Sequence, residues 1–279
     1  MTGQTVLVWG EQGIGDQIIF GGLLSWLAST AGRCIFKCDE RLAPAFRRAF
    51  PGVEVIGAAA RPDKRTLSPD ITIQIPLASL MAAIPGWPDK FEFPTRYLEP
   101  DKTLSADTGK QLANAHVSGF KIGIAWHSAR PKVGPKKSTP LALWSPILTQ
   151  PDCSFINLQY GDTDADVALV QRDMGVQVYT HPEIDRFNDL DALLALIDRL
   201  DLVITTSNVT AHLAASLGKP CWLLLQNLPI WYWKREGDGV LFYPSVRAFR
   251  QLQAGDWETV IADAAAALQS WRSQDGDNR

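Results

Sequence analysis

The fold class follows from one stretch, Thr5-Val6-Leu7-Val8-Trp9-Gly10-Glu11-Gln12-Gly13-Ile14-Gly15-Asp16. An apolar run of strand length leads into a loop with three glycines and then into a helix-patterned segment, residues 16–30. Glycines let the backbone turn sharply where a strand ends and a helix begins, which is how a Rossmann-like unit starts. Because ligands of such folds bind beyond the carboxyl ends of the strands, this loop is a candidate functional site.

The same alternation of short apolar runs and helix patterns continues along the chain, which predicts an α/β fold with mostly parallel strands. In the first half we predict further strands at 33–38, 53–56 and 71–75 and a helix at 41–50. In the second half we predict strands at 121–126, 154–158, 177–179, 202–205 and 221–225. The helices predicted between and after them cover 141–149, 164–173, 190–200, 209–217 and 257–271.

Two such alternating regions are separated by a proline-rich segment that contains Pro85, Pro88, Pro94 and Pro100. Each proline removes a backbone donor and disfavours helix before it. We therefore predict an N-terminal Rossmann-like domain at 1–100, a linker at 101–120 with a bridging helix at 101–116, and a C-terminal Rossmann-like domain at 121–255. A C-terminal helix at 256–272 and a flexible tail at 273–279 complete the predicted organisation.

Composition narrows the classes of function. The formal net charge of −3 over 279 residues provides no broad positive field, so we expect no nucleic-acid partner. The longest apolar stretch, residues 18–28, is far shorter than the roughly 20 residues that span a bilayer, so we expect no transmembrane segment. The N-terminus lacks the charged region and apolar core of a signal peptide, which favours a cytoplasmic location. The four cysteines have no metal-ligand spacing.

Asp16 is the candidate general base. The glycine order in its loop is Gly-x-x-Gly-x-Gly, whereas a dinucleotide fingerprint reads Gly-x-Gly-x-x-Gly, so a nicotinamide-dependent oxidoreductase is disfavoured. A carboxylate at a helix N-terminus repels a phosphate, and Asp16 is better suited to take a proton from a neutral acceptor hydroxyl. Gln12, Gly13 and Gly15 would then form an acceptor-side loop. The alternative is that Asp16 only caps its helix.

A basic loop, residues 127–138, follows the strand at 121–126. His127, Lys132, Lys136 and Lys137 are the candidate donor-binding side chains in it. Cations at this place can neutralise a diphosphate leaving group, which is the electrostatic task of sugar transfer without a metal. The alternative is a solvated basic loop without a ligand.

A second candidate donor site joins the strand at 202–205 to the next helix. Ser207 and Asn208 are good helix N-cap residues, and the exposed amides behind them can bind an anion. Thr210 lies in the first turn of that helix. His212, about one turn in, could reach the same ligand, although a lone helical histidine is more often a satisfied core residue.

Two further motifs can each be interpreted in two ways. The aromatic cluster Trp231-Tyr232-Trp233 could stack on a base or a sugar, or pack between domains. Asp162-Thr163-Asp164 is similar to the Asp-x-Asp of metal-nucleotide sites, but it precedes a helix pattern, so capping is favoured and we expect no metal site.

Four blocks, at 8–16, 155–162, 208–220 and 243–247, carry a resemblance to a known family. They resemble the glycosyltransferase portion of bacterial tetratricopeptide-repeat glycosyltransferases. That portion is similar in turn to the ADP-heptose:lipopolysaccharide heptosyltransferases of glycosyltransferase family 9. The resemblance implies a GT-B fold, in which two Rossmann-like domains face each other across a cleft.

The resemblance also implies a chemistry. The first domain would bind the acceptor, which is a carbohydrate, a lipid-linked glycan or a protein hydroxyl, and the second would bind a nucleotide-sugar donor, with Gln159 among the donor-side residues. Asp16 would match the catalytic aspartate, and transfer would be inverting, with no metal or other cofactor. Ser207-Asn208-Val209 departs from the Asp-Thr-small pattern of heptosyltransferases. A catalytically inactive nucleotide-sugar-binding or regulatory module is therefore the alternative.

Overall fold

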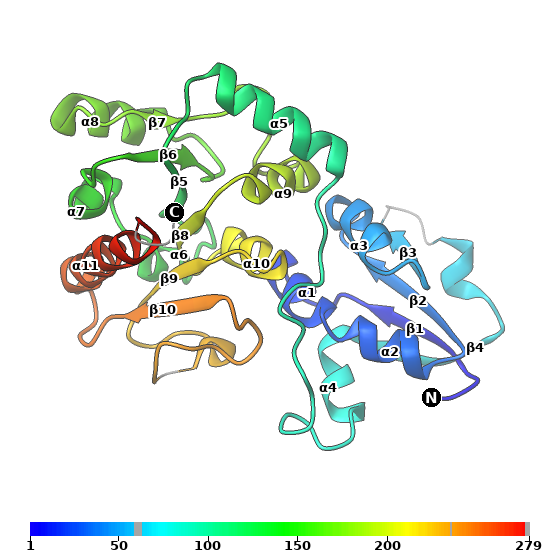
Figure 1. Ribbon diagram of the computed structural model, residues 1–279. Helices are drawn as coiled ribbons and strands as arrows, with labels where there is room; N and C mark the ends of the chain where they lie inside the picture. The colour runs from blue at the N-terminus through cyan, green and yellow to red at the C-terminus, as the bar shows by residue number, and fades with distance from the viewer. Residues whose placement is uncertain (59–62, 235, 277–279) are drawn as a thin grey trace.

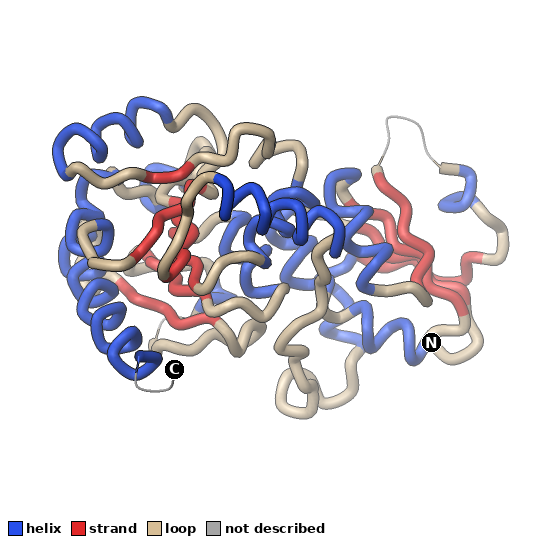
Figure 2. The backbone as a smooth tube through the Cα atoms, turned by 45° about the horizontal axis from the view of Figure 1, so that its top comes forward, coloured by secondary structure: helices blue, strands red, loops and turns tan. Residues whose placement is uncertain are grey.

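The computed structural model describes residues 1–58, 63–234 and 236–276, with side chains described up to Trp271. The strands form two separate parallel sheets with helices between them (Figure 1, Figure 2). One sheet has four strands in the order β3-β2-β1-β4, and the other has six in the order β10-β9-β8-β5-β6-β7. The predicted α/β class is confirmed.

The four-stranded sheet is built from the first 76 residues. Its strands are β1 (Thr5–Trp9), β2 (Arg33–Cys38), β3 (Val53–Gly57) and β4 (Ile71–Pro76). Its helices are α1 (Ile14–Gly21), α2 (Leu24–Thr30), α3 (Ala43–Ala49) and α4 (Leu80–Ala83), with 3-10 turns at η1 (Glu40–Leu42), η2 (Lys64–Leu67) and η3 (Leu77–Ser79).

The helix predicted at 16–30 is divided into α1 and α2. Gly21 and Gly22 lie at the break, and both let other groups approach the backbone closely. A Cβ on Gly21 would lie 2.5 Å from Phe46 Cε1, and one on Gly22 would lie 3.3 Å from Tyr97 Cε1. Two adjacent glycines also weaken a helix, so tertiary packing decides the path of the chain here.

The six-stranded sheet has the strand order of a complete Rossmann unit. Its strands are β5 (Phe120–Ala125), β6 (Cys153–Asn157), β7 (Val178–Tyr179), β8 (Leu202–Thr206), β9 (Cys221–Leu225) and β10 (Val246–Arg250). If these six strands are numbered 1 to 6 in chain order, their order across the sheet from the β7 edge is 3-2-1-4-5-6. The order reverses between β5 and β8, and ligands of such sheets bind at that point.

Eight helical segments accompany this sheet in the described part of the chain after β5. They are α6 (Gly134–Lys137), η4 (Leu141–Trp144), α7 (Ser145–Leu148), α8 (Asp164–Met174), α9 (Leu190–Asp198), α10 (Val209–Ser216), η5 (Trp231–Trp233) and α11 (Trp257–Gly276). The helix predicted at 141–149 is thus a 3-10 turn followed by one short helix. Pro146 near the start of α7 cannot donate a backbone hydrogen bond, so the helix starts anew there.

The predicted linker at 101–120 contains α5 (Lys102–Asn114), which packs against α9 of the second sheet (Figure 1). Asp101 caps this helix by accepting from the amides of Thr103 and Leu104, at 2.8 and 3.0 Å. Ser105 donates its hydroxyl to Asp198 Oδ2 at 2.5 Å. The bridging segment is therefore joined to the second half of the molecule by side-chain contacts.

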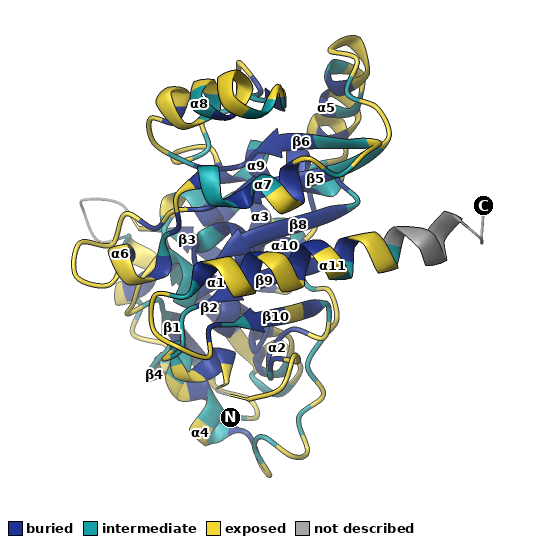
Figure 3. Cartoon of the chain, turned by 90° about the vertical axis from the view of Figure 1, so that its left-hand side faces the viewer, coloured by how far each residue is buried: buried dark blue, intermediate teal, exposed yellow. Residues whose placement is uncertain are grey.

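The C-terminal helix α11 continues beyond its predicted end. It runs to Gly276, so most of the tail predicted at 273–279 is helical, and 277–279 lie outside the described residues. Figure 3 shows that buried and exposed residues alternate along α11. The buried ones belong to the core cluster of the second sheet: Trp257, Val260, Ile261, Ala264, Ala265 and Leu268. These apolar side chains hold the helix on the sheet.

The two halves share a packed interface. One continuous cluster of buried side chains extends from the first sheet through α1 and α10 to the second sheet. Phe20 of α1 packs edge-on against Phe242 with ring centroids 5.6 Å apart. Arg48 forms an ion pair with Asp191, and its Nη1 donates to Asp191 Oδ2 at 2.9 Å. No helix in the described parts of the chain combines the length and the apolar character needed to cross a membrane.

Candidate active site

A cavity of about 380 Å³ lies where the loop after β1 meets the loops after β5 and β8. Asp16 lines it from the first half, and Arg130, Lys137, Asn208 and His212 line it from the second half. The β5 and β8 loops flank the switch point of the second sheet. The structure therefore brings together most of the candidate residues that the sequence places in separate loops.

Asp16 sits in the first turn of α1 and is partly buried. Burial raises the pKa of its carboxyl group above the usual value, and the charges of Arg130 and Lys137 and the nearby amides of Gly13 and Asp16 oppose that rise. Asp16 forms no ion pair with either cation among the described residues, so their charges act on the carboxyl group without direct contact. Gly13, and not Asp16, is the N-cap of α1. The Asp16 carboxylate lies near the amides of Gly13 and Asp16, where a negative charge also stabilises the N-terminal end of the helix.

Neighbouring side chains hold the Asp16 loop in place. Glu11 accepts hydrogen bonds from the amides of Leu77 and Ala78, at 3.0 and 3.3 Å. Gln17 donates to the carbonyl oxygen of Gln12 at 3.2 Å and accepts from the amide of Asp39 at 2.8 Å. Gln12 itself is exposed and does not line the cavity, so its contribution to the predicted acceptor-side loop is its backbone.

The basic loop contributes one buried lysine. Lys137 is only 5% exposed, lines the cavity and makes no hydrogen bond or ion pair with the described residues. Burial lowers the pKa of its amine, as does the charge of Arg130, while Asp16 counteracts the change. Lys136 is exposed beside a neighbouring cavity of about 730 Å³, and Lys132 is exposed and lines none of the cavities described here. An unpaired buried ammonium calls for an anionic partner.

The polar side chains of the loop before α10 form hydrogen bonds with other groups of the protein. Asn208 is the N-cap of α10 and accepts from the amide of Thr210 at 3.0 Å, and its Nδ2 donates to the carbonyl oxygen of His127 at 3.3 Å. Ser207 accepts from Trp233 Nε1 at 2.9 Å. Thr210 is buried and does not line the cavity. What this loop offers an anion is the positive N-terminal end of α10.

His212 is both a buried histidine and part of the cavity wall. Its ring stacks on Trp233 with centroids 4.8 Å apart, and a Cβ on Gly15 would lie 2.9 Å from His212 Cδ2. Burial lowers the pKa of its imidazole to about 3, helped by the charge of Lys137, so the ring is neutral at physiological pH.

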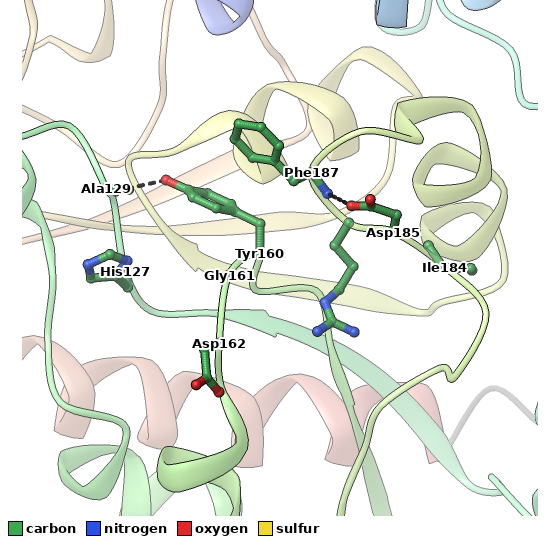
Figure 4. Close-up of a pocket in the computed structure, with 9 residues that line it drawn as sticks. His127, Ala129, Tyr160, Gly161, Asp162, Ile184, Asp185 and Phe187 are labelled. Carbon is green, nitrogen blue, oxygen red and sulfur yellow. Dashed lines mark hydrogen bonds between the residues drawn. The ribbon is translucent and has the colours of Figure 1, made fainter.

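A second cavity, of about 590 Å³, adjoins the first (Figure 4). Tyr160 and Phe187 line both cavities, with ring centroids 5.8 Å apart, and Tyr160 Oη accepts from the amide of Ala129 at 2.8 Å. Two carboxylates, Asp162 and Asp185, also line it. From the first half, the Arg41 guanidinium lies 5.1 Å from the centre of the Phe187 ring.

The other candidate residues lie around this second cavity. His127 is exposed on its wall. Gln159 is buried behind it, where Oε1 accepts from the amides of Trp126 and His127 at 3.0 and 2.8 Å, so it shapes the start of the basic loop instead of lining a cavity. Asp162 Oδ1 accepts from the amide of Asp164 at 3.1 Å, which supports the capping interpretation of that motif.

Several residues that line the cavities are absent from the predicted donor set, among them Arg130, Tyr160, Asp185, Phe187 and Tyr232. Arg130 could have been predicted from the sequence, because it lies in the basic loop at 127–138. In the aromatic cluster, Tyr232 lines the central cavity, whereas Trp231 packs on Phe20 with centroids 6.3 Å apart, which is interdomain packing. No cluster of three or more histidine, cysteine or acidic groups in the described residues could hold a metal ion.

Comparison with curated proteins finds a relative over the length of this chain. No family model matches. Protein FlbA of Caulobacter vibrioides is 31% identical over 296 residues, which cover 97% of this chain and 47% of FlbA. The chain thus spans about half the length of the curated relative that it matches.

Comparison with solved structures identifies the fold. A glycosyl transferase family 9 protein from Veillonella parvula has a TM-score of 0.64 at 14% identity, covering 94% of this chain and 91% of that one. ADP-heptose lps heptosyltransferase II of E. coli has a TM-score of 0.57 at 13% identity, covering 96% and 99%. E. coli heptosyltransferase WaaC with ADP-2-deoxy-2-fluoro heptose has a TM-score of 0.55 at 12% identity, covering 98% and 100%.

These likenesses confirm the predicted arrangement of two Rossmann-like halves, while the predicted kinship with tetratricopeptide-repeat glycosyltransferases stays a prediction. The strand orders of both sheets and the match over almost the whole chain point to the same architecture. This chain has the GT-B fold of the heptosyltransferase-like glycosyltransferases of family 9.

Proposed function

We propose that this protein is a glycosyltransferase that moves a sugar from a nucleotide-sugar to a hydroxyl acceptor, with inversion and without a bound metal. One observation carries the proposal: a partly buried carboxylate, Asp16, shares a cavity with the unpaired Lys137, with Arg130 and with the N-terminal end of α10. A base for the acceptor and positive charge for the leaving group thus face each other across the boundary between the two halves.

The diphosphate of the donor would lie on the second half. Lys137 and Arg130 supply charge, and the amides that begin α10 supply hydrogen-bond donors. The nucleoside would then occupy the adjoining cavity, where Tyr160 and Phe187 can stack on the base. Asp162 or Asp185 can accept hydrogen bonds from ribose hydroxyls.

The chemical step follows from these positions. Asp16 takes the proton of the acceptor hydroxyl, whose oxygen attacks the anomeric carbon of the sugar. The bond from that carbon to the nucleoside diphosphate breaks, and the leaving diphosphate keeps the electron pair, stabilised by Arg130 and Lys137. One displacement inverts the anomeric configuration. The raised pKa of the Asp16 carboxyl makes it a stronger base than an exposed aspartate.

Structural neighbours support the donor class. WaaC is solved with ADP, and TibC, a dodecameric iron-containing heptosyltransferase, is solved in complex with ADP-D-β-D-heptose. For this chain the nucleotide-sugar is a proposal, and so is the acceptor, which is a carbohydrate, a lipid-linked glycan or a protein hydroxyl. A cytoplasmic location stays a prediction.

The second candidate function is a binding or regulatory module without turnover. It is favoured by Asn208, whose side chain caps α10 and holds the basic loop, at the place where heptosyltransferases commonly have Asp-Thr. Such a module would keep the cavity and lack transfer.

Thermal unfolding against a panel of ADP-, UDP-, GDP- and CMP-linked sugars tests the proposal, because a ligand that binds the folded state raises the midpoint. We expect one nucleotide class to raise it, and the shift to be lost in Lys137→Met. Transfer or donor hydrolysis that is lost in Asp16→Asn would establish the enzyme. Binding without any turnover by the wild-type protein would establish the module instead, and no binding in the panel would contradict both.

A further inference from the structure

His212 directs one ring nitrogen toward a chain of two tyrosines. Its Nδ1 lies 3.1 Å from Tyr243 Oη, and Tyr243 Oη lies 3.3 Å from Tyr97 Oη. Tyr97 in turn donates its hydroxyl to the carbonyl oxygen of Ile18 at 2.6 Å. These four residues, named here the tyrosine relay, connect α10 of the second half to α1 of the first.

The far end of the tyrosine relay sets the direction of every bond in it. A carbonyl oxygen can only accept, so the single hydroxyl hydrogen of Tyr97 goes to Ile18. Tyr97 Oη can then only accept, which makes Tyr243 the donor in that pair. Tyr243 Oη must therefore accept from His212, and Nδ1 of His212 carries a hydrogen.

The other ring nitrogen, Nε2, is consequently a lone-pair acceptor. The buried imidazole is neutral and has one ring hydrogen, which the relay places on Nδ1. Nε2 makes no hydrogen bond with the described residues. It lies at the Gly15 side of the ring, since a Cβ on Gly15 would be 3.1 Å from it. His212, Gly15 and Asp16 line the same cavity.

We propose that Tyr97 and Tyr243 are positioning residues that hold His212 in the Nδ1-protonated tautomer, so that Nε2 accepts a hydrogen bond from a carbohydrate hydroxyl in the cavity. The assignment of the ligand rests on the proposed function. A lone pair attracts a hydroxyl hydrogen and repels a phosphate oxygen, which also carries lone pairs.

The tyrosine relay would thereby orient the ligand. The diphosphate is directed to the side of Arg130 and Lys137, and the sugar ring to the side of His212 and Asp16, where the acceptor is activated. Because the relay ends on Ile18 of α1, it is complete only when the two halves are docked as they are here. The contact between the two halves thus decides which ring nitrogen of His212 carries the hydrogen.

The nitrogen-15 NMR resonances of the histidine ring in the full chain test the tautomer without any ligand. The protein has four histidines, so the His212→Gln spectrum assigns the signal. In the wild-type protein we expect a protonated Nδ1 and a bare Nε2. In Tyr97→Phe, Tyr243 loses its acceptor and can satisfy its hydroxyl by donating to Nδ1, so we expect the hydrogen to move to Nε2.

Two further variants make this test specific. Tyr243→Phe removes the partner of Nδ1, and we expect a mixture of both tautomers. Tyr160→Phe removes a tyrosine hydroxyl from the same cavity but not from the relay, and we expect the wild-type spectrum. A wild-type protein with hydrogen on Nε2, or a tautomer unchanged in both relay variants, would overturn the proposal.

A second measurement tests the hydroxyl. ADP-glucose and UDP-glucose are titrated against ADP and UDP, with the Nε2 resonance and the Kd as readouts. We expect a sugar nucleotide to shift the resonance more than its plain diphosphate does, and Tyr97→Phe to weaken only the former, by about tenfold. Equal responses would overturn the sugar assignment. If none of the four probes binds, the carbohydrate assignment fails, whereas the proposed function fails only if the GDP- and CMP-linked sugars of the thermal panel do not bind either. The ligand-free spectra still decide whether the relay sets the tautomer.

Discussion

Gly15 of α1 and His212 of α10 lie against each other across the boundary between the two sheets. A Cβ on Gly15 would lie 2.9 Å from His212 Cδ2 and 3.1 Å from Nε2. The ring cannot retreat freely, because Trp233 stacks on it at 4.8 Å and Tyr243 holds Nδ1. This contact brings the Asp16 loop beside the residues of the second half that line the cavity.

The first prediction concerns this contact. Gly15→Ala should destabilise the protein by about 1–3 kcal/mol, because the added methyl group must displace a packed ring. Urea denaturation measures the change. Gly52→Ala is the matched control, since nothing lies within 4 Å of a Cβ at that position, and we expect a change within about 0.5 kcal/mol. Equal free energies of unfolding for the two variants would show that the His212 ring moves aside without cost.

The second prediction separates two lysines of the basic loop. Lys137→Met should weaken binding of the nucleotide-sugar about 10- to 100-fold, because a hydrogen bond to a charged group contributes about 1.5–3 kcal/mol. Lys132→Met removes the same charge from an exposed place outside the described cavities and should leave the Kd within about twofold. Calorimetric titration measures both. Similar losses in the two variants would mean that the loop acts through its overall charge.

The third prediction concerns the base. Asp16→Asn keeps the shape of the side chain and removes its ability to take a proton, so the transfer rate should fall about 10²- to 10⁴-fold. The Kd for the donor should not weaken, because the lost negative charge lies in the cavity that would hold the diphosphate. Steady-state kinetics and titration measure the two quantities. A variant that transfers sugar at the wild-type rate would remove Asp16 from the mechanism.

The pKa shift of the same carboxyl predicts a dependence of stability on pH. Its folded-state pKa is raised above the ordinary value of 3.8, so its stabilising contribution is present below pH 3.8 and is lost as the pH rises through the folded-state pKa. The neutral Asp16→Asn should therefore unfold at a higher temperature than the wild-type protein at pH 7. The difference should shrink toward pH 3.8. A lower Tm for the variant at pH 7 would contradict this sign.

The fifth prediction concerns Phe187, which is 53% exposed yet contacts both Tyr160 and Arg41. Phe187→Ala should weaken binding of the nucleotide-sugar about 2- to 12-fold through lost stacking worth about 0.5–1.5 kcal/mol. Its effect on stability should be small, because more than half of the residue is exposed. Leu252→Ala, at an 87% exposed residue outside the described cavities, is the control. A large loss of stability with unchanged affinity would assign Phe187 to domain packing alone.

Some elements could be predicted to the residue. The strands predicted at 5–9, 33–38 and 221–225 have those bounds in the structure, because an apolar run between polar or glycine residues is a local signal. The sequence pattern does not predict β10. Arg247 and Arg250 interrupt its apolar pattern. Its backbone hydrogen bonds go to β9, from which a long loop separates it, so no local signal marks this strand.

The candidate site shows the same division. The three loops could be found from the sequence, because each follows an apolar strand run and carries glycines, cations or cap residues. Which lysine enters the cavity could not be found. Lys132, Lys136 and Lys137 are equivalent in type, and only the turn of α6 buries Lys137. Gln159 and Thr210 have polar side chains in these loops, yet both point into the protein.

The sequence by itself determined the α/β class, the places of most strands and the loops where polar chemistry gathers, because these depend on neighbours a few residues away. The tertiary structure alone decided that Asp16 shares a cavity with Lys137, that His212 lies against Gly15, and that Tyr97 reaches Ile18. The first two contacts join the two halves, and the third belongs to a chain of hydrogen bonds that crosses between them at Tyr97 and Tyr243. They depend on how two packed surfaces dock, and no local pattern of residues encodes that arrangement.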